Sequence, residues 1–237
     1  MVPPASNKMK INFFRHSFFK ISCGEKNILV DPYTRDDSSE RAAFKPLVKC
    51  PPLKDALKNT DMILITHEHF DHFEKDTIEK IAKNNNCFVV GHESVLNKLD
   101  LPQTCLKSVN GFDKIDIKGV NIDCYPAHHH NSFYPLSYLM TIGNKSVFHA
   151  GDTSLVEMFS KIKSNVAILP VGGAKMTMDV VDAVRAIKMM KPDYAIPMHY
   201  DTFEQIKADP REFKHKIEKS ILKTKAVILQ PGGCFSF

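Results

Sequence analysis

HEHFDH, running from His67 to His72, is the stretch of this chain that says most about its fold and its chemistry. It comes just after MILI, Met62 to Ile65, an uninterrupted apolar run of strand length. The pattern predicts a loop at the end of a buried strand, where functional groups usually lie. Imidazole and carboxylate groups are common ligands of Zn²⁺ and its transition-metal neighbours. A polar loop with chance histidines is the alternative, but H-x-H-x-D-H after a strand favours a metal site.

The spacing inside this stretch divides its side chains between two metal positions. His67 and His69 are two residues apart, so both can reach one ion from an extended turn. Asp71 and His72 come after the turn and can face a second ion. The residues at positions 68 and 70 alternate with these four, and we expect them to point elsewhere.

Other histidines and aspartates also follow apolar, strand-like runs. They are Asp31 after Asn27–Val30, His128-His129-His130 after Val120–Tyr125, Asp152 after Lys145–His149, and His199 after Tyr194–Ile196. Sites in α/β proteins assemble where the carboxyl ends of strands meet at one edge of a sheet. We therefore expect these segments to lie close to the His67–His72 loop.

Apolar periodicity and turn residues predict a chain that begins with strands and then mixes strands with helices. The expected helices are Leu53–Lys58, Thr77–Lys83, Ser94–Leu99 with a serine cap, Val180–Ile187 capped by Asp179, and Arg211–Ser220. The expected strands are Ile11–Phe14, Phe18–Ser22, Asn27–Val30, Met62–Ile65, Phe88–Gly91, Phe112–Ile117, Val120–Tyr125, Leu136–Ile142, Lys145–His149, Val166–Leu169, Tyr194–Met198 and Ala226–Leu229. Periodicity alone supports a mixed α/β fold.

With these motifs the chain resembles the metallo-β-lactamase superfamily from about Lys10 to Gly232. Within it, the chain is similar to the small single-domain metal-dependent hydrolases that include ascorbate-6-phosphate lactonases. That closer likeness rests on Arg15–Ser17, Pro126–His129, His149–Thr153 and Met198–Phe203. The resemblance implies the α+β class and a four-layer αββα sandwich. It also implies one domain over residues 1–237, with the folded part beginning at about residue 9.

The resemblance also implies a dinuclear metal site. One ion would be held by His67, His69 and His129, the other by Asp71, His72 and His199, with Asp152 bridging both. The family pattern Pro-Ala-x-His sets the register on His129 rather than on its neighbours. A donor set of nitrogen and oxygen suits two divalent ions, Zn²⁺ first, with Mn²⁺ or Fe²⁺ as alternatives.

Three further side chains have expected roles around the metals. In the family an aspartate at the place of Asp31 supports the ligand loop from behind. His16 lies in a turn between two strands, and we expect it to contact substrate or transfer a proton. Asp71 is expected to orient the attacking hydroxide. His149 lies inside a strand, so it is expected to be a hydrogen-bonded core histidine.

Composition is that of an ordinary globular protein, with 43% hydrophobic and 25% charged residues and a net charge of +5. The lysines are scattered, which favours solvated helix faces over a nucleic-acid surface. No apolar run reaches 18 residues, so no membrane span is expected. The polar segment Met1–Lys8 does not resemble an export signal, and the six cysteines lack a C-x-x-C pair. These features predict a cytoplasmic location.

The function expected from the residues and the resemblance is hydrolysis by a metal-activated hydroxide. The substrate would be a small ester, lactone or phosphodiester. Loops Tyr33–Pro52 and Gly172–Met178 are expected to frame the pocket, and Arg35 and Lys175 in them suit an anionic group, although both could equally be solvated charges. One alternative is a nuclease acting on RNA or DNA; no inserted segment is long enough to grip a polymer. The other is a non-catalytic metal-binding sensor or scaffold, which the complete ligand set disfavours.

Overall fold

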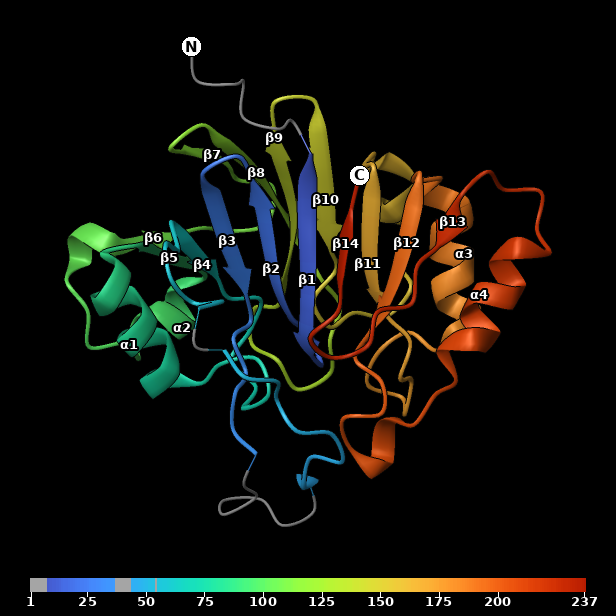
Figure 1. Cartoon of the computed structure of the whole chain (residues 1–237), viewed down its shortest axis with the longest axis horizontal. Helices are drawn as coiled ribbons and strands as arrows, with labels where there is room; N and C mark the ends of the chain where they lie inside the picture. Colours follow the sequence, from blue (N-terminus) through green and yellow to red (C-terminus); the bar gives the residue numbers. More distant parts are fainter. Residues whose placement is uncertain (1–7, 37–43, 54) are drawn as a thin grey trace.

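Two sheets face each other and helices cover their outer sides, as the computed structural model shows (Figure 1). The structure describes residues 8–36, 44–53 and 55–237, and in these residues each sheet has seven strands. This arrangement confirms the expected α+β class and four-layer αββα sandwich. Positions 1–7 and positions 37–43 of the expected Tyr33–Pro52 loop lie outside the described residues.

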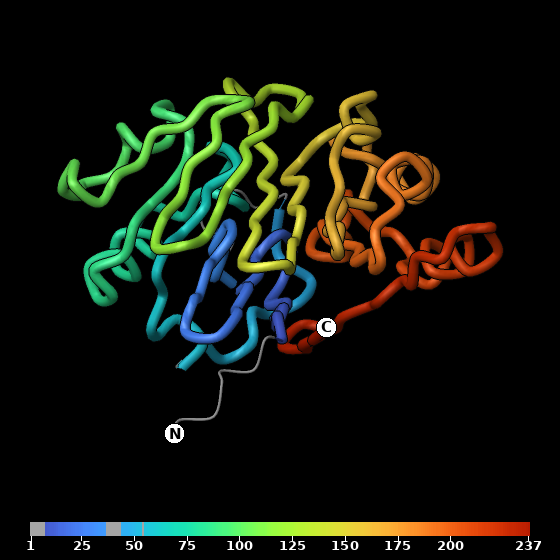
Figure 2. Tube along the Cα trace, turned by 90° about the horizontal axis from the view of Figure 1, so that it is seen from above, coloured from blue at the N-terminus to red at the C-terminus, as the bar shows by residue number. Residues whose placement is uncertain are grey.

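The first sheet has the strand order β14-β1-β2-β3-β4-β5-β6. Its first three strands pair antiparallel, and β3 to β6 pair parallel. The C-terminal strand β14 returns to pair with β1, so the first and last strands of the chain lie side by side (Figure 2). The strands are β1 (Met9–Arg15), β2 (Phe18–Cys23), β3 (Lys26–Val30), β4 (Met62–Leu64), β5 (Phe88–Gly91), β6 (Leu106–Ser108) and β14 (Cys234–Ser236).

The second sheet has the strand order β13-β12-β11-β10-β9-β8-β7. Strands β7 to β10 form an antiparallel meander, and β10 to β13 pair parallel. The strands are β7 (Lys114–Ile117), β8 (Val120–Pro126), β9 (Leu136–Ile142), β10 (Lys145–His149), β11 (Val166–Pro170), β12 (Tyr194–Met198) and β13 (Lys225–Ala226).

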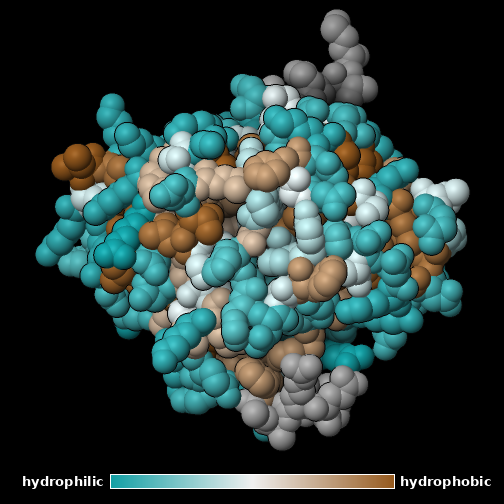
Figure 3. Space-filling model, turned by 180° about the vertical axis from the view of Figure 1, so that it is seen from behind, coloured by the Kyte–Doolittle hydropathy of each residue, from teal (hydrophilic) through white to brown (hydrophobic). Residues whose placement is uncertain are grey.

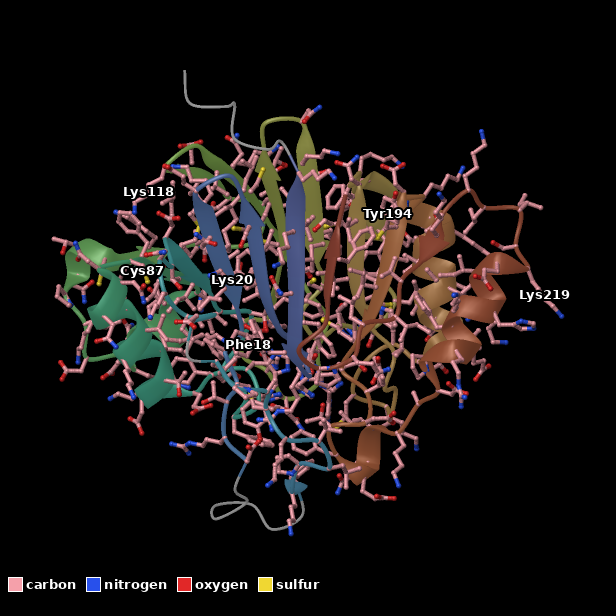
Figure 4. All side chains as sticks on the ribbon, viewed as in Figure 1. Phe18, Lys20, Cys87, Lys118, Tyr194 and Lys219 are labelled. Atoms are coloured by element: carbon pink, nitrogen blue, oxygen red, sulfur yellow. The ribbon has the colours of Figure 1, made fainter. Side chains whose placement is uncertain are left out.

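The helices are short, and α2, α3 and α4 begin at a side chain that caps the first turn. Asp179 accepts the Asp182 N–H at the start of α3, as expected, and Asp209 caps α4 in the same way. The α-helices are α1 (Lys75–Asn85), α2 (Glu93–Leu96), α3 (Val180–Met190) and α4 (Pro210–Glu218); the 3₁₀ turns are η2 (Gln103–Cys105), η3 (Glu157–Lys161) and η4 (Glu204–Ile206). Lys219, just beyond α4, projects into solvent, whereas Phe18 is fully buried on β2 (Figure 4).

Three expected elements differ in the structure. The helix expected at Leu53–Lys58 is a series of turns in its described residues, closed by bonds from Ala56 N–H to Leu53 O and from Lys58 N–H to Asp55 O. Both bonds span three residues, whereas an α-helix needs bonds that span four. Helix α2 is capped by His92, whose ring accepts the Ser94 N–H, and not by a serine.

The third difference is at the sheet edge, where β13 covers Lys225–Ala226 instead of Ala226–Leu229. It is the outermost strand and pairs with β12 at Tyr194 and Ala195.

Alternation along the strands divides the apolar side chains between two cores. Ile28 and Val30 belong to the large core that contains strands of both sheets. Leu29, between them, belongs to the core under α1 and α2. Hydrophilic side chains predominate on the face seen in Figure 3, where the hydrophobic ones form separate patches. In the part of the chain that the structure describes, no helix is long and apolar enough to cross a bilayer.

Strand direction brings the polar loops to one edge of the sandwich. In the first sheet β1, β3 and β4 run the same way, because β1 and β3 are both antiparallel to β2 and β3 is parallel to β4. In the second sheet β8, β10 and β12 share a direction by the same reasoning. The loops after these strands gather below the sheets in Figure 1. The expected convergence of strand ends is therefore present.

Gly151, in the turn after β10, illustrates how tightly this edge is packed. Its φ is +58°, and an added Cβ would lie 2.8 Å from Leu136 O and 3.0 Å from Thr66 Cβ. Gly143 has almost the same φ, +59°, with nothing within 4 Å of such a Cβ. We expect Gly143→Ala to cost roughly 1 kcal/mol for the left-handed backbone. Gly151→Ala should cost about 1–3 kcal/mol more for overpacking.

Denaturant unfolding of both variants at equal metal loading measures this difference. Equal losses of unfolding free energy would show that the contact between the Gly151 turn and Thr66 is not tight.

Candidate metal centre

Side chains from both sheets meet at this edge in groups that could each hold a metal. Within each group the possible ligand atoms lie within 4.8 Å of one another. The groups are His67, His69 and His129; His16, Asp71, His72 and His199; and His67, His72 and Asp152. The structure thus brings together all seven side chains expected as ligands and adds His16 to the second group.

Asp152 lies between the first two groups. Its Oδ2 is 2.9 Å from His199 Nε2, 3.4 Å from His72 Nε2 and 3.6 Å from His129 Nε2. Its other oxygen, Oδ1, is buried and has no hydrogen-bond partner among the described residues. A carboxylate placed in this way can face a cation on each side, which is the geometry a bridging ligand needs.

Asp31 holds the proton on Nδ1 of His72. Its carboxylate accepts the Thr66 N–H at 2.8 Å, the Thr66 hydroxyl at 2.6 Å and His72 Nδ1–H at 2.7 Å. Because Nδ1–H is committed to Asp31, Nε2 is the nitrogen that faces Asp152 and would bind a cation. Asp31 therefore supports the ligand loop from behind, where the resemblance placed it.

Thr66 determines which ring nitrogen of His67 carries the proton, a role that sequence reasoning missed. Because the Thr66 hydroxyl gives its hydrogen to Asp31, it can only accept from His67 Nδ1, 3.0 Å away. His67 Nε2 then carries a lone pair, and this buried atom lacks a partner in the described part of the chain. The only sequence signal was the position of Thr66 between the apolar strand and the first ligand.

His69 and His129 show most clearly that these residues fit a cation. His129 Nδ1 donates to Met176 O at 2.8 Å, and His69 Nε2 donates to Asn131 O at 3.3 Å. The remaining ring nitrogens, His129 Nε2 and His69 Nδ1, are 3.0 Å apart. Two lone pairs that face each other at this distance repel, and a cation between them removes the repulsion.

The three adjacent histidines after β8 differ in burial. His129 is buried and joins the first group, whereas His128 and His130 are exposed. The Thr153 hydroxyl accepts the backbone N–H of His128, which fixes the register of this loop against the Asp152 turn.

His16 is a buried neighbour of Asp71. Its side chain has no exposed surface, and its Nε2 is 3.1 Å from Asp71 Oδ2. His16 and His199 both have left-handed backbone, with φ of +58° and +54°, and His199 N–H donates to His16 O at 3.0 Å. Strained turns from the two sheets are thus joined at the site. Sequence reasoning did not place His16 within a ligand group, because turn geometry decides it.

Charge and burial set the protonation states. Burial alone would raise the pKa of Asp152, but His199 and His72 hold that pKa well below its usual range. Burial together with the charge of His199 lowers the pKa of His16 to about 3. Burial would lower the pKa of His72, but Asp152 and Asp31 outweigh it and raise the pKa. A bound cation would compete with this proton, so metal binding should release it.

His149 has a different role from the ligands. It is fully buried, its Nε2 donates to Ser17 O at 3.0 Å, and its Nδ1 accepts the Gly151 N–H at 3.2 Å. Both ring nitrogens are thereby satisfied, which confirms the expected core histidine.

The described residues of the two loops that were expected to frame the pocket lie at the border of the site. Buried Arg15 donates to Arg35 O at 2.6 Å and to Val48 O at 3.0 Å, and so ties both arms of the first loop to β1. Four aromatic rings form a cluster there, Tyr33, Phe44, Phe70 and Phe203, and the rings of Tyr33 and Phe203 contact His16. The second loop approaches closely at Gly172, where an added Cβ would lie 2.2 Å from His199 O.

Comparison with known proteins identifies relatives along nearly the whole chain. Residues 10–199 match the model of the β-lactamase superfamily domain. A protein of Methanosarcina mazei named UPF0173 metal-dependent hydrolase is 30% identical over 94% of this chain and 96% of its own length. One of the same name from Thermoplasma acidophilum is 35% identical over 87% of this chain and 89% of its own.

Solved structures with a similar fold cover nearly the whole chain as well. Igni18, a metallo hydrolase from the archaeon Ignicoccus hospitalis, is 30% identical with a TM-score of 0.82, covering 97% of this chain and 98% of its own. An isothiocyanate hydrolase from Delia radicum gut bacteria is 18% identical with a TM-score of 0.79, covering 97% and 99% of the two chains, and shares the fold.

The three adjacent histidines allow a matched test of metal binding. We expect His129→Ala to lose metal, because it removes one of the two facing lone pairs. His128→Ala and His130→Ala should keep the wild-type metal content, because both side chains are exposed. Elemental analysis after loading with Zn²⁺ and dialysis measures this. Loss of metal in His128→Ala with retention in His129→Ala would place the register one residue earlier.

Asp31→Asn tests the support behind the ligands. An amide cannot accept all three hydrogen bonds, so His72 and Thr66 lose their fixed orientation, and Zn²⁺ affinity should fall about 10–100-fold. Asp201→Asn is the matched control, since Asp201 also has positive φ but accepts the Ala208 N–H outside the ligand groups. Competition with a chromogenic chelator measures both affinities. Equal Zn²⁺ affinity in the two variants would contradict the role of Asp31.

Proposed function

The chain belongs to the metallo-β-lactamase superfamily and is a metal-dependent hydrolase, and from this premise we propose that it uses two divalent cations to hydrolyse a small ester, lactone or phosphodiester. One observation carries the proposal. Two groups of ligand atoms converge on a shared carboxylate, that of Asp152. The first cation would be held by His67, His69 and His129, the second by Asp71, His72 and His199, and Asp152 would lie between them.

A donor set of imidazoles and carboxylates fits Zn²⁺ first, with Mn²⁺ or Fe²⁺ as alternatives. When bound, such cations would activate water as a nucleophile and neutralise the negative charge that builds on the substrate oxygen. The protein itself would supply orientation. Asp31 and Thr66 hold the imidazoles in the required tautomers, and the packed ligand loops exclude bulk water around them.

Asp71 and His16 are the proposed catalytic pair. Asp71 is partly exposed, with 13% of its side chain accessible, so its carboxylate can orient the attacking water. His16 is fully buried and would reach the reaction only through Asp71, whose Oδ2 lies 3.1 Å from its Nε2. We assign His16 the role of holding that carboxylate in place.

The proposed substrate carries an anionic group that meets Lys175. Lys175 is exposed on the loop whose Met176 carbonyl holds His129. The other cation expected for this role, Arg35, lies 3.7 Å from Glu74 and 3.4 Å from Asp76, so carboxylates of the protein already neutralise it. A single lysine suits one phosphate or carboxylate rather than a long polyanion.

A substrate screen on protein loaded separately with Zn²⁺ and Mn²⁺ tests the proposal. The compounds are p-nitrophenyl acetate, a γ-lactone, bis-p-nitrophenyl phosphate and single-stranded RNA. We expect turnover of at least one small compound, lost on chelation and in Asp152→Ala. Lys175→Ala should raise KM for the anionic diester about threefold, the size of one exposed charge interaction. Lys219→Ala, a lysine that projects into solvent just beyond α4, is the control.

Efficient RNA cleavage with inertness towards every small compound would overturn the substrate class and favour the nuclease alternative. Inertness towards all four, with metal bound, would favour the non-catalytic sensor or scaffold.

A further inference from the structure

Phe133 lies beside the ligand loop with most of its ring in water. It is 77% exposed, the highest value for a phenylalanine among the described residues. A large ring left in solvent forgoes the stabilisation that burial gives. Single exposed apolar residues are common, so the question is whether the surrounding structure holds this one in place.

Two residues of the ligand loop hold the segment that carries Phe133. Glu68 accepts the Phe133 N–H at 2.7 Å with one oxygen and the Ser132 hydroxyl at 3.0 Å with the other. The carbonyl of Asn131 accepts from His69 Nε2. Three consecutive residues are therefore fixed to positions 68 and 69 of the metal-binding motif. Glu68 alternates with the ligands, as expected, and its carboxylate is committed to this segment.

A second exposed apolar side chain flanks the same ligands. Met176 is 36% exposed, and its carbonyl accepts from His129 Nδ1. His129 and His69 in turn face each other, with Nε2 and Nδ1 3.0 Å apart. Phe133 and Met176 thus belong to the two segments that support one pair of ligands, and each is within two residues of the supporting carbonyl.

The distribution of exposed apolar residues points to the same edge. The described residues include six large exposed hydrophobic side chains, of which Leu47, Phe133 and Met176 are in loops around the ligand groups. The others, Phe112, Val181 and Ile221, are in a turn before β7, on α3 and after α4. Half of the exposed large apolar side chains therefore surround the site.

We propose that Phe133 and Met176 form an apolar subsite that binds an alkyl or aryl part of the substrate next to the bond that is hydrolysed. The inference rests on the proposed function, because it places that bond at the His67–His69–His129 group. A phenyl ring offers a flat apolar face, and an unbranched thioether adapts to groups of different shape. Glu68 is the positioning residue that holds the Phe133 segment against the ligand loop.

Binding of phosphonates tests the subsite without requiring turnover. Methyl-, butyl- and phenylphosphonate share one metal-seeking head and differ only in the apolar group. Each fully buried methylene contributes about fourfold in affinity. With partial burial, we expect zinc-loaded wild-type protein to bind the butyl and phenyl compounds at least tenfold more tightly than the methyl compound, by titration calorimetry.

The variants are chosen to separate the subsite from stability and from metal binding. Phe133→Ala should reduce the butyl-to-methyl affinity ratio to about two, with the methylphosphonate Kd and the zinc content unchanged. Phe133→Leu should keep most of the ratio. Glu68→Gln should lower the ratio by weakening the support of Phe133. Phe112→Ala, a phenylalanine of similar exposure at 67% outside the ligand loops, should leave the ratio at its wild-type value.

An affinity ratio near one in the wild type, or an unchanged ratio in Phe133→Ala, would overturn the subsite. So would a change of oligomeric state in Phe133→Ala with the ratio unchanged, since the ring would then contact a second copy. The two proposals fail separately. Hydrolysis without an alkyl preference would remove the subsite and keep the proposed function, whereas alkyl preference without hydrolysis would do the reverse.

Discussion

The buried carboxylate of Asp31 is the contact on which the metal centre depends. Asp31 directly follows β3, accepts two hydrogen bonds from Thr66, which lies two residues after β4, and accepts a third from His72. Through the Thr66 hydroxyl it also determines that His67 Nδ1 carries the proton. One acceptor group therefore decides which nitrogen of two imidazoles carries the proton and which faces the site. Without it, the same histidines would still be adjacent, but their lone pairs would not be directed at a common point.

The sandwich fold brings strand ends from two sheets together, which the contacts of Asp31 alone do not do. His67 and His72 follow a strand of the first sheet, whereas His129, Asp152 and His199 follow strands of the second. The close contacts at Gly151 and Gly172 bring their loops together. The cost of this arrangement is a set of partly buried lone pairs that face one another, such as those of His69 and His129. A cation offsets that cost, so metal binding and the stability of this edge should be coupled.

Much of this could be predicted from the sequence, because strand ends and ligand spacing are local patterns. The H-x-H-x-D-H motif was predictable for that reason, whereas the choice of ligands after β8, β10 and β12 came from the resemblance to the family. The place of His16 was not, because it depends on a left-handed turn packed against His199 from the other sheet. Nor was the Met176 carbonyl, since a backbone acceptor has no sequence signature. The short edge strands β6 and β14 were missed because three residues give too little periodicity.

The most direct test of two cations around one carboxylate is anomalous diffraction at the zinc edge from crystals of the zinc-loaded protein. The account predicts two peaks about 3.5–4 Å apart. One should lie against His67, His69 and His129, the other against Asp71, His72 and His199, with Asp152 between them. A single peak at full zinc loading, or two peaks of which neither contacts Asp152, would contradict the account.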